Sequence, residues 1–191
     1  MSRGLDNVVH LVQHFLSPSV QNGGTVIDAT AGRGHDTLYL AGLVGPSGRV
    51  FSFDVQEDAL QSTRSLLEGA GVADRVTLVK DCHGNMEHYV SGPVDSVIFN
   101  LGYLPGGEHS VITEPASTVR ALQAALGLLR PAGRVGMVIY PGHPGGREEY
   151  EAVEKICSSL DKTLFNALKI GLLNRAATAP VVIIIEKADV R

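Results

Sequence analysis

Acidic residues and closely spaced glycines mark the segment best suited to ligand chemistry. Residues 26–36 read VIDATAGRGHD, in which Asp28 ends an apolar, strand-like run and Gly32 and Gly34 follow it. Glycine permits positive φ angles and lets a ligand approach the backbone closely. A second carboxylate, Asp54, ends the next apolar run, about 20 residues beyond the glycines, where it can accept hydrogen bonds from both ribose hydroxyls of an adenosine. The spacing predicts an adenosyl-binding loop.

The same loop favours a sulfonium ligand over a pyrophosphate. The dinucleotide pattern GxGxxG is not met, because position 37 is Thr, and a loop that holds no pyrophosphate needs no third glycine. Asp28 would repel a phosphate, whereas its charge suits a cationic sulfonium and an α-amino group. The alternative role for Asp28 and Asp54 is to cap a turn or a helix.

Polar residues also follow the second and third apolar runs. Asp81 ends the third run and can reach an adenine, and the backbone of Cys82 or the imidazole of His83 can border that ring. Gln56 stands two residues after Asp54. The alternatives are a loop without chemistry for Cys82 and His83 and a plain surface position for Gln56.

The stretch 99–107, FNLGYLPGG, is a candidate for the part of the site that holds the group to be methylated. An asparagine at a strand end, a tight turn and an aromatic residue resemble the N-P-P-[YF] element of amino-methylating enzymes. Methyl transfer to nitrogen is an in-line displacement, so the Asn100 side-chain oxygen and a neighbouring carbonyl would accept two N–H bonds and aim the lone pair. The aromatic Tyr103 can pack on a flat substrate. Leu101 and Gly102 replace the two prolines, which weakens the likeness, and Asn100 as a turn cap is the alternative.

The fifth apolar run ends in YPGHPGG at 140–146, beside the fourth-strand loop in the expected sheet. Glycine and proline shape this loop. His143 is a candidate general base or phosphate contact, with a surface turn as the alternative. Tyr140 fits the core as well as the site.

Apolar periodicity indicates which elements position these residues. Strands are expected over 25–29, 49–54, 75–80, 94–100 and 134–140, and helices over 5–16, from about 36, over 59–70, over 119–129 before Pro131, and over 150–160. This alternation predicts an open parallel α/β sheet with helices on both faces. Residues 164–173 and 181–187 also resemble strands, but about seven residues are too few for a parallel crossover, so these two strands should pair antiparallel.

Five strands joined by helices, followed by a terminal hairpin, are typical of class I S-adenosylmethionine (SAM)-dependent methyltransferases, a Rossmann-like fold. An NAD-dependent oxidoreductase, the less favoured alternative, would continue with another βαβ unit. The 191 residues suit a single methyltransferase domain, 1–191, with an N-terminal helix within 1–20 packing on its core.

Composition narrows the class further. Hydrophobic residues make up 44% and charged residues 19%, which excludes a disordered or fibrous chain, and the net charge of -4 excludes a basic surface over the whole chain. Five residues, 181–185, form the longest strongly apolar run, far below the roughly 20 of a membrane span, and the start does not resemble a signal peptide. Two distant cysteines suit a reducing cytoplasm. His10 and His14 lack further ligands, so no metal site is expected.

Five stretches together resemble one known family: DATAGRGHDT at 28–37, FDVQ at 53–56, DCH at 81–83, FNLGYLP at 99–105 and YPGH at 140–143. They are similar to the YtqB-like family, long labelled as rRNA methylases, whose MnmM-type members methylate the wobble uridine of tRNA. The resemblance implies methyl transfer from SAM to the amine of 5-aminomethyl(-2-thio)uridine, which gives the 5-methylaminomethyl form.

The resemblance also implies a site. The SAM pocket would include Asp28, Gly32, Gly34, Asp36, Asp54, Gln56 and His83. Ala29, Thr30, Arg33, Asp81, Cys82 and Asn100 complete the expected pocket. The turn Asn100, Leu101, Gly102 and Tyr103 would face the amine. Arg33 stands where the family more often has Asn, so a polar contact to the methionine carboxylate is either charged here or lost.

The chemistry requires a deprotonated amine, because an ammonium has no lone pair. Candidate bases are His143 and Tyr140. The expected partner is the tRNA anticodon stem-loop, gripped by a few local Arg and Lys residues, by loops or by the second subunit of a homodimer. The alternatives are an rRNA or a small-molecule amine as substrate, or an adenosyl-binding module without catalysis.

Overall fold

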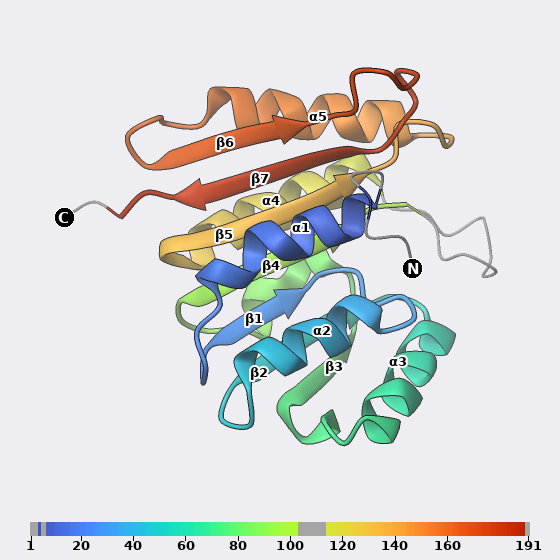
Figure 1. Cartoon of the computed structure of the whole chain (residues 1–191), viewed down its shortest axis with the longest axis vertical. Helices are drawn as coiled ribbons and strands as arrows, with labels where there is room; N and C mark the ends of the chain where they lie inside the picture. The colour runs from blue at the N-terminus through green and yellow to red at the C-terminus, as the bar shows by residue number, and fades with distance from the viewer. Residues whose placement is uncertain (1–3, 5–6, 103–113, 190–191) are drawn as a thin grey trace.

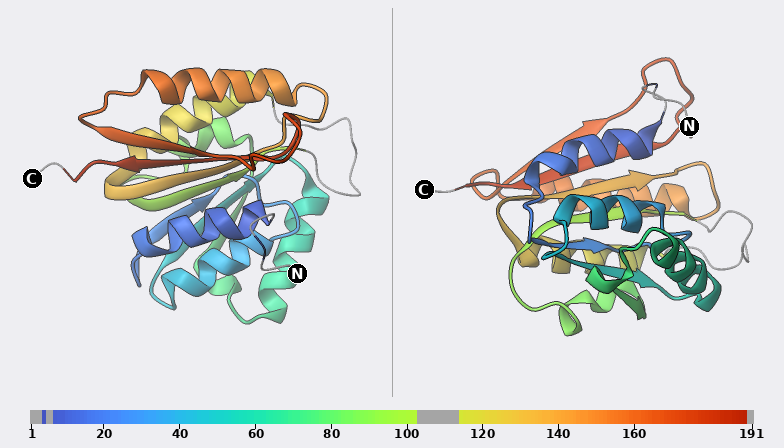
Figure 2. Two further views of the ribbon diagram at one scale, coloured as in Figure 1. Left: turned by 45° about the horizontal axis from the view of Figure 1, so that its top comes forward. Right: turned by 60° about the horizontal axis from the view of Figure 1, so that its bottom comes forward.

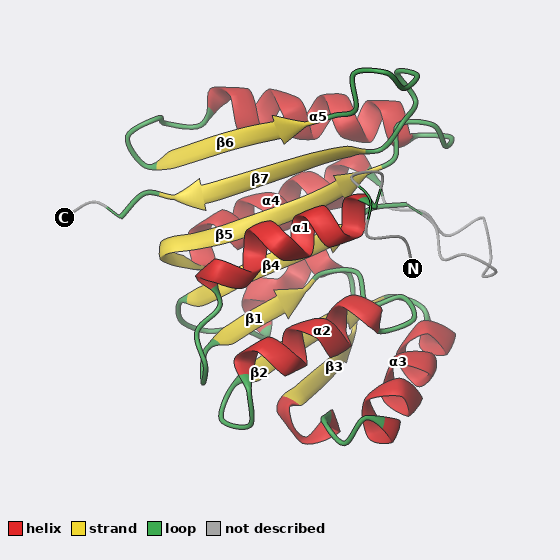
Figure 3. Cartoon of the chain, viewed as in Figure 1, coloured by secondary structure: helices red, strands yellow, loops and turns green. Residues whose placement is uncertain are grey.

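Seven strands form one sheet in the order β3-β2-β1-β4-β5-β7-β6, as the computed structural model shows (Figure 1 and Figure 3). The structure describes residue 4 and residues 7–102 and 114–189. The strands are β1 (Thr25–Asp28), β2 (Arg49–Asp54), β3 (Val76–Lys80), β4 (Val94–Asn100), β5 (Leu129–Ile139), β6 (Phe165–Ile170) and β7 (Val181–Lys187). Strands β1 to β5 pair in parallel, as predicted.

Helices cover both faces of this sheet, so the molecule has three layers (Figure 2). One face carries α1 (Val8–Leu16), α2 (His35–Val44) and α3 (Glu57–Gly69), and the other carries α4 (Pro115–Leu128), α5 (Gly146–Ser159) and the 3-10 helix η3 (His83–His88). Two shorter 3-10 turns are η1 (Ser17–Ser19) and η2 (Ala73–Arg75). No helix in the described ranges is long and apolar enough to cross a membrane.

Strand β4 lies at the centre of the core and contributes to both layers. Val97 and Phe99 pack in the apolar cluster beneath α4 and α5, whereas Ile98 packs in the cluster beneath α1 and α2. All three side chains are essentially inaccessible to water. Successive residues of a strand face opposite sides, so a strand covered on both faces is apolar throughout.

The terminal hairpin predicted from the short connection is confirmed. Strand β7 runs antiparallel to β6, and Ile183 is the register partner of Lys169. Strand β7 also pairs antiparallel with β5, where Ile183 is opposite Met137. It therefore lies between β5 and β6, which leaves β6 at the sheet edge (Figure 1).

The boundary between the fourth helix and the fifth strand differs from the prediction. The helix was expected to reach 129 and the strand to start at 134, but α4 ends at Leu128 and β5 already begins at Leu129. Leu129 pairs with Val94, the register then shifts, and Ala132 adopts a positive φ of 58°. Pro131 therefore lies in an irregular part of β5 and does not end the helix.

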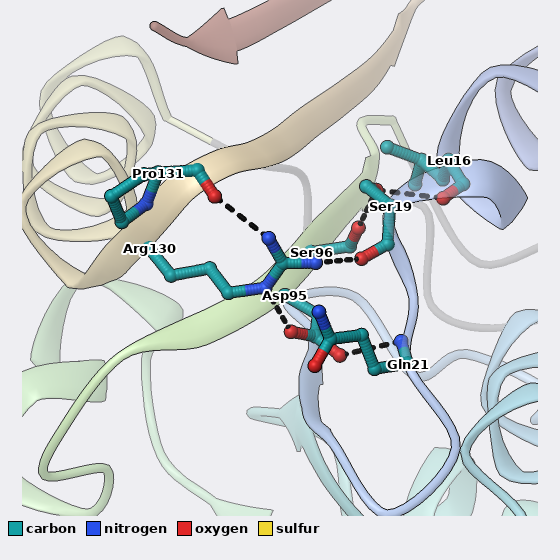
Figure 4. A network of polar contacts seen from close by, with 7 residues as sticks. All are labelled: Leu16, Ser19, Gln21, Asp95, Ser96, Arg130 and Pro131. Carbon is teal, nitrogen blue, oxygen red and sulfur yellow. Dashed lines mark hydrogen bonds and ion pairs between the residues drawn. The ribbon is translucent and has the colours of Figure 1, made fainter. Parts of the chain in front are cut away.

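A polar network draws this part of the chain into the sheet (Figure 4). The Arg130 guanidinium donates to an Asp95 carboxylate oxygen and, over 2.6 Å, to the Ser19 carbonyl. The other Asp95 oxygen accepts from the Gln21 amide at 2.7 Å. These bonds tie β5 and the segment after α1 to the start of β4. They lie at the amino end of β4, whereas the predicted site residues lie at the carboxyl ends of the strands.

Candidate active site

A cavity of about 620 Å³ opens at the carboxyl ends of the parallel strands, a volume within the range of small-molecule sites. Most residues predicted for the site line it: Ala29, Thr30, Gly32, Arg33, Asp36, Asp54, Gln56, Asp81, Cys82, His83, Asn100, Leu101, Gly102, Tyr140 and His143. Asp28 and Gly34 do not belong to the lining. Tyr103 lies outside the described residues.

The glycine loop is shaped by its contacts with β2 and α3. Its Ala31 amide donates to the Phe53 carbonyl over 2.8 Å, and the Gly32 amide donates to Asp54 over 2.9 Å. Gly34 has a φ of 82°, and a Cβ at this position would come within 2.9 Å of Thr63 in α3. Glycine is therefore required at position 34 by the positive φ and by the close packing against Thr63.

Asp54 at the end of β2 holds the loop and still faces the cavity. One carboxylate oxygen accepts from Gly32, and the other accepts from the Gln56 amide at 2.9 Å. A carboxylate has about four lone-pair positions, so Asp54 can also accept hydrogen bonds from hydroxyl groups of a ligand.

Asp81 at the third strand end is tied to its own loop. It accepts from the Cys82 amide at 2.7 Å, from the Asn85 side chain at 3.0 Å and from the Tyr89 hydroxyl at 2.9 Å. Burial raises the pKa of the Asp81 carboxyl, but the three hydrogen bonds outweigh it and the net pKa is lowered. The carboxylate is therefore ionised at neutral pH.

His83 presents a buried hydrogen-bond acceptor to the cavity. Nδ1 contacts the Ala29 carbonyl at 3.0 Å, so Nδ1 carries the hydrogen and Nε2 carries the lone pair. The ring lies edge-on to Phe99, and burial lowers the pKa of the imidazole, which keeps it neutral. Nε2 is buried and has no hydrogen-bond partner within the described part of the chain. Such an atom fits a donor from a bound ligand.

Asp28 lies behind the glycine loop, fully buried, and not in the cavity as the sequence suggested. It accepts from the Thr37 hydroxyl at 2.6 Å and from the Thr30 amide at 3.0 Å. Burial and the nearby charge of Asp36 raise the pKa of Asp28 to about 7. This geometry therefore gives Asp28 no direct contact with a cationic ligand in the cavity.

Asn100, the last residue of β4, is held at two points. Its backbone amide donates to the Thr30 hydroxyl over 2.8 Å, and its side-chain nitrogen lies 3.5 Å from an Asp36 carboxylate oxygen. A carboxylate accepts hydrogen bonds, so the amide nitrogen of Asn100 faces Asp36. The amide oxygen is consequently the group that Asn100 offers to a ligand in the cavity.

Loops after β4 and β5 meet on the other side of the cavity. Gly102 has a φ of 149°, and a Cβ built there would lie 3.6 Å from the Tyr140 ring and 3.9 Å from His143 Nε2. His143 Nδ1 contacts the Pro144 carbonyl at 2.8 Å, which leaves the lone pair on Nε2. This second imidazole nitrogen is also buried without a partner among the residues that the structure describes. Burial and Asp36 raise the pKa of the Tyr140 hydroxyl.

The structure adds residues that the sequence did not single out. Ala31, His35, Phe53, Val55, Ser117, Gly142 and Thr178 also line the cavity. Gln13 of α1 donates to Asp36 over 2.7 Å. Its only signal in the sequence is a polar residue within an apolar helix. No group of His, Cys, Asp or Glu in the described ranges has an arrangement suited to a metal ion.

Comparisons with known proteins agree on one kind of relative. The model of the family described as "Putative rRNA methylase" matches residues 50–186. The chain is 43% identical over 180 residues to "tRNA (mnm(5)s(2)U34)-methyltransferase, chloroplastic" of Arabidopsis thaliana. That match covers 89% of this chain but 65% of the plant protein, so the chain spans slightly less than two thirds of this relative.

Two solved structures are similar over nearly their whole length. A "putative rRNA-methylase" from Clostridium thermocellum has a TM-score of 0.93 and 42% identity, with 96% of this chain and 99% of that chain covered. A "putative methyltransferase" from Streptococcus mutans in complex with SAH has a TM-score of 0.86 and 36% identity, with 98% and 99% covered. TM-scores of this size over nearly the whole chain show that both proteins share the fold of this chain.

Proposed function

Because the chain belongs to this rRNA methylase family, we propose that it is a SAM-dependent N-methyltransferase of tRNA. The proposed substrate is 5-aminomethyl(-2-thio)uridine at the wobble position, and the product is its 5-methylaminomethyl form. The plant relative, named for wobble-uridine methylation, supports this choice. The fold is that of class I SAM-dependent methyltransferases, with the antiparallel C-terminal pair predicted from the sequence.

The cavity has the donors and acceptors that an adenosyl cofactor needs. Asp54 at the end of β2 would accept the ribose hydroxyls, and His83 Nε2 would accept one further hydrogen bond. Asp36, which lines the cavity, would bring a negative charge near the positive sulfonium and amino groups. When bound, SAM supplies an electrophilic methyl group on a sulfonium that leaves as a neutral thioether. The relative crystallised with SAH, the demethylated cofactor, supports this assignment.

The observation that carries the proposal is the double anchoring of Asn100. Its backbone is fixed on Thr30 in the cofactor loop and its side-chain nitrogen on Asp36, so the amide oxygen is the part left for the substrate. That oxygen would accept an N–H of the substrate amine and direct the nitrogen lone pair along the line of attack. Fixing a nucleophile in line is worth several orders of magnitude in rate.

The amine reaches the site mostly as an ammonium and must lose a proton before attack. His143 is the proposed acceptor, because its Nε2 carries a lone pair, lies near Gly102 and has no partner within the described ranges. Tyr140 is the second candidate, although the raised pKa of its hydroxyl makes the phenolate rare at neutral pH. The proton on nitrogen would pass to the imidazole, which would free the lone pair for the methyl group that SAM supplies.

The proposed partner is the anticodon stem-loop of tRNA. The exposed Arg33 and His35 lie at the cavity and offer local contacts for phosphate groups, which an acidic chain needs at its RNA site. We propose that the single domain works as a homodimer, which would extend this surface, and that it acts where tRNA is present, in the cytoplasm. Sedimentation of the protein with and without tRNA measures the oligomeric state.

The proposal is tested by incubating the protein with SAM and tRNA that carries the aminomethyl wobble base. The expected product is a nucleoside heavier by one methylene unit in the digest. Unmodified tRNA of the same sequence and ribosomal RNA serve as matched controls and should remain unmethylated. Methylation of ribosomal RNA alone, or no product on the correctly modified tRNA, would overturn the proposal.

A further inference from the structure

Helix α1 places one amide side chain against Asp36, a residue of the cavity lining. Gln13 Nε2 donates to Asp36 Oδ1 over 2.7 Å, and the Gln13 carbonyl accepts from the Tyr39 hydroxyl of α2 at 3.2 Å. Asp36 is 7% exposed, so this contact is largely sheltered from water. Helices α1 and α2, which β1 separates in the sequence, are thus joined through the Asp36 carboxylate.

The two oxygens of Asp36 have different partners. Oδ1 accepts from Gln13, and Oδ2 faces the side-chain nitrogen of Asn100 at 3.5 Å. A planar carboxylate held at one oxygen can present the other in only a narrow range of directions. The Gln13 contact therefore also limits which way the Asn100 amide can turn, since the reversed amide would place its oxygen against a carboxylate.

We propose that Gln13 is a positioning residue for methyl transfer: it holds Asp36 so that the carboxylate fixes Asn100 with its amide oxygen toward the substrate amine. This inference rests on the proposed function, because it assigns Asn100 the role of aiming an amine. Gln13 itself does not line the cavity. It acts on the reaction through two hydrogen bonds.

The charge state of Asp36 offers a readout of this arrangement. The pKa of the Asp36 carboxyl is raised above its ordinary value, because burial outweighs the hydrogen bonds from Gln13 and Asn100, which lower it. The titratable groups around it are Asp28 behind the loop, His35 on α2, His10 on α1 and Tyr140 after β5.

Loss of the Gln13 donor must raise the pKa of Asp36 further. A protonated Asp36 would no longer orient Asn100, so the part of the acidic limb of the kcat profile that Asp36 contributes should move to higher pH.

The test compares Gln13→Met, which keeps the length of the side chain but removes its donor, with Tyr39→Phe. Tyr39→Phe removes the hydrogen bond to the Gln13 backbone carbonyl but leaves the Gln13 side-chain amide intact. It is therefore a matched control. For Gln13→Met we expect kcat to fall about tenfold, the effect of one lost hydrogen bond. The affinity for SAM and the KM for tRNA should stay within about twofold of wild type, because Gln13 does not line the cavity. Tyr39→Phe should retain the wild-type kcat and pH profile.

The outcomes separate the inference from the function beneath it. A Gln13→Met enzyme with wild-type kcat and an unmoved acidic limb overturns the positioning role, as does an equal loss of kcat in both variants with no change in the limb. Gln13→Ala repeats the measurement if the Met variant does not fold. A wild-type protein that leaves modified tRNA unmethylated overturns the proposed function and this inference with it.

Discussion

Strand β4 has a polar cluster at each end, and the two clusters are built on opposite principles. At its amino end, the buried Asp95 and the partly buried Arg130 are bonded to each other and to neighbouring backbone groups (Figure 4). At its carboxyl end, Asn100 lies in a cavity where His83 and His143 each keep one buried nitrogen without a partner in the described part of the chain. Buried polar groups normally find partners. The incomplete cluster is therefore the one prepared for a ligand.

The carboxylates at the two ends show the same contrast. Asp95 faces a guanidinium, whereas Asp28 lies beside Asp36, a group of like charge that raises its pKa. A buried charge is costly to the fold once its opposite partner is removed, while neighbouring buried carboxyls repel each other when both are ionised, an arrangement common in functional sites. The comparison predicts that variants at the amino end of β4 lose stability and keep activity. Variants at the carboxyl end should lose activity or cofactor affinity and keep their stability.

The largest effect is expected from Asp95→Ala. It leaves the Arg130 guanidinium, whose side chain is 22% exposed, without its carboxylate and removes the acceptor of the Gln21 amide. The free energy of unfolding should fall by roughly 3 kcal/mol, toward the lower end of values for broken buried ion pairs. Urea unfolding measures this, and methyl transfer per folded molecule should be unchanged.

A double-mutant cycle with Arg130→Met sharpens this prediction, because it isolates the coupling between the two side chains. A coupling near zero, or a loss of kcat at temperatures where Asp95→Ala is fully folded, would contradict the assignment of this cluster to stability alone.

Asn100→Ala should produce the second-largest effect, at the other end of the same strand. The backbone bond to Thr30 is retained, but the side-chain oxygen that would aim the amine is lost. We expect kcat to fall by about 100-fold, the usual effect of a misaligned nucleophile. SAM affinity, measured by calorimetry, should stay within about twofold, since positioning of the amine is separate from cofactor binding. Retained activity would remove Asn100 from the proposed mechanism.

Asp28→Asn tests the like-charged pair through pH. The pKa of Asp28 is raised to about 7, so the folded protein holds a proton that the unfolded chain releases near pH 4. This contribution to stability is complete at low pH and is lost as the pH rises through 7. Between pH 5 and pH 8 the wild type should lose roughly 2–3 kcal/mol of unfolding free energy more than Asp28→Asn.

Asp81→Asn is the matched control for that experiment. The net pKa of Asp81 is lowered, so its contribution is lost only in acid, and the change in stability between pH 5 and pH 8 should equal that of wild type. If Asp28→Asn shows the same pH dependence as wild type, Asp28 is ionised throughout this range.

The sequence predicted the strands well wherever burial leaves a simple pattern. The bounds of β2, β4 and β7 agree with the apolar runs at 49–54, 94–100 and 181–187. The start of β5 was missed because Leu129 fits the spacing of the preceding helix, while its pairing with Val94 and the Arg130–Asp95 contact depend on tertiary structure. Periodicity contains no information on such long-range contacts.

Among the site residues, too, those marked by a local pattern could be predicted and those that depend on long-range contacts could not. Residues at strand ends, such as Asp54 and Asn100, could be located because parallel strands end at one edge of the sheet. The inward position of Asp28 depends on Thr37 and Thr30, and the link from Gln13 to Asp36 depends on how two helices pack. Neither arrangement leaves a local pattern in the sequence.

The smallest effect is expected at His83, where a single neutral hydrogen bond is at stake. In His83→Asn the shorter amide can still donate to the Ala29 carbonyl, as Nδ1 does now, but nothing replaces the Nε2 acceptor. SAM affinity measured by calorimetry should fall about tenfold, the worth of one such bond, with little change in the melting temperature. Cys82→Ala, at the neighbouring lining position, should bind SAM as wild type does. If His83→Asn binds SAM normally and instead loses stability, the carboxyl-end cluster is structural at this residue, and the contrast between the two ends of β4 would rest on Asn100 and His143.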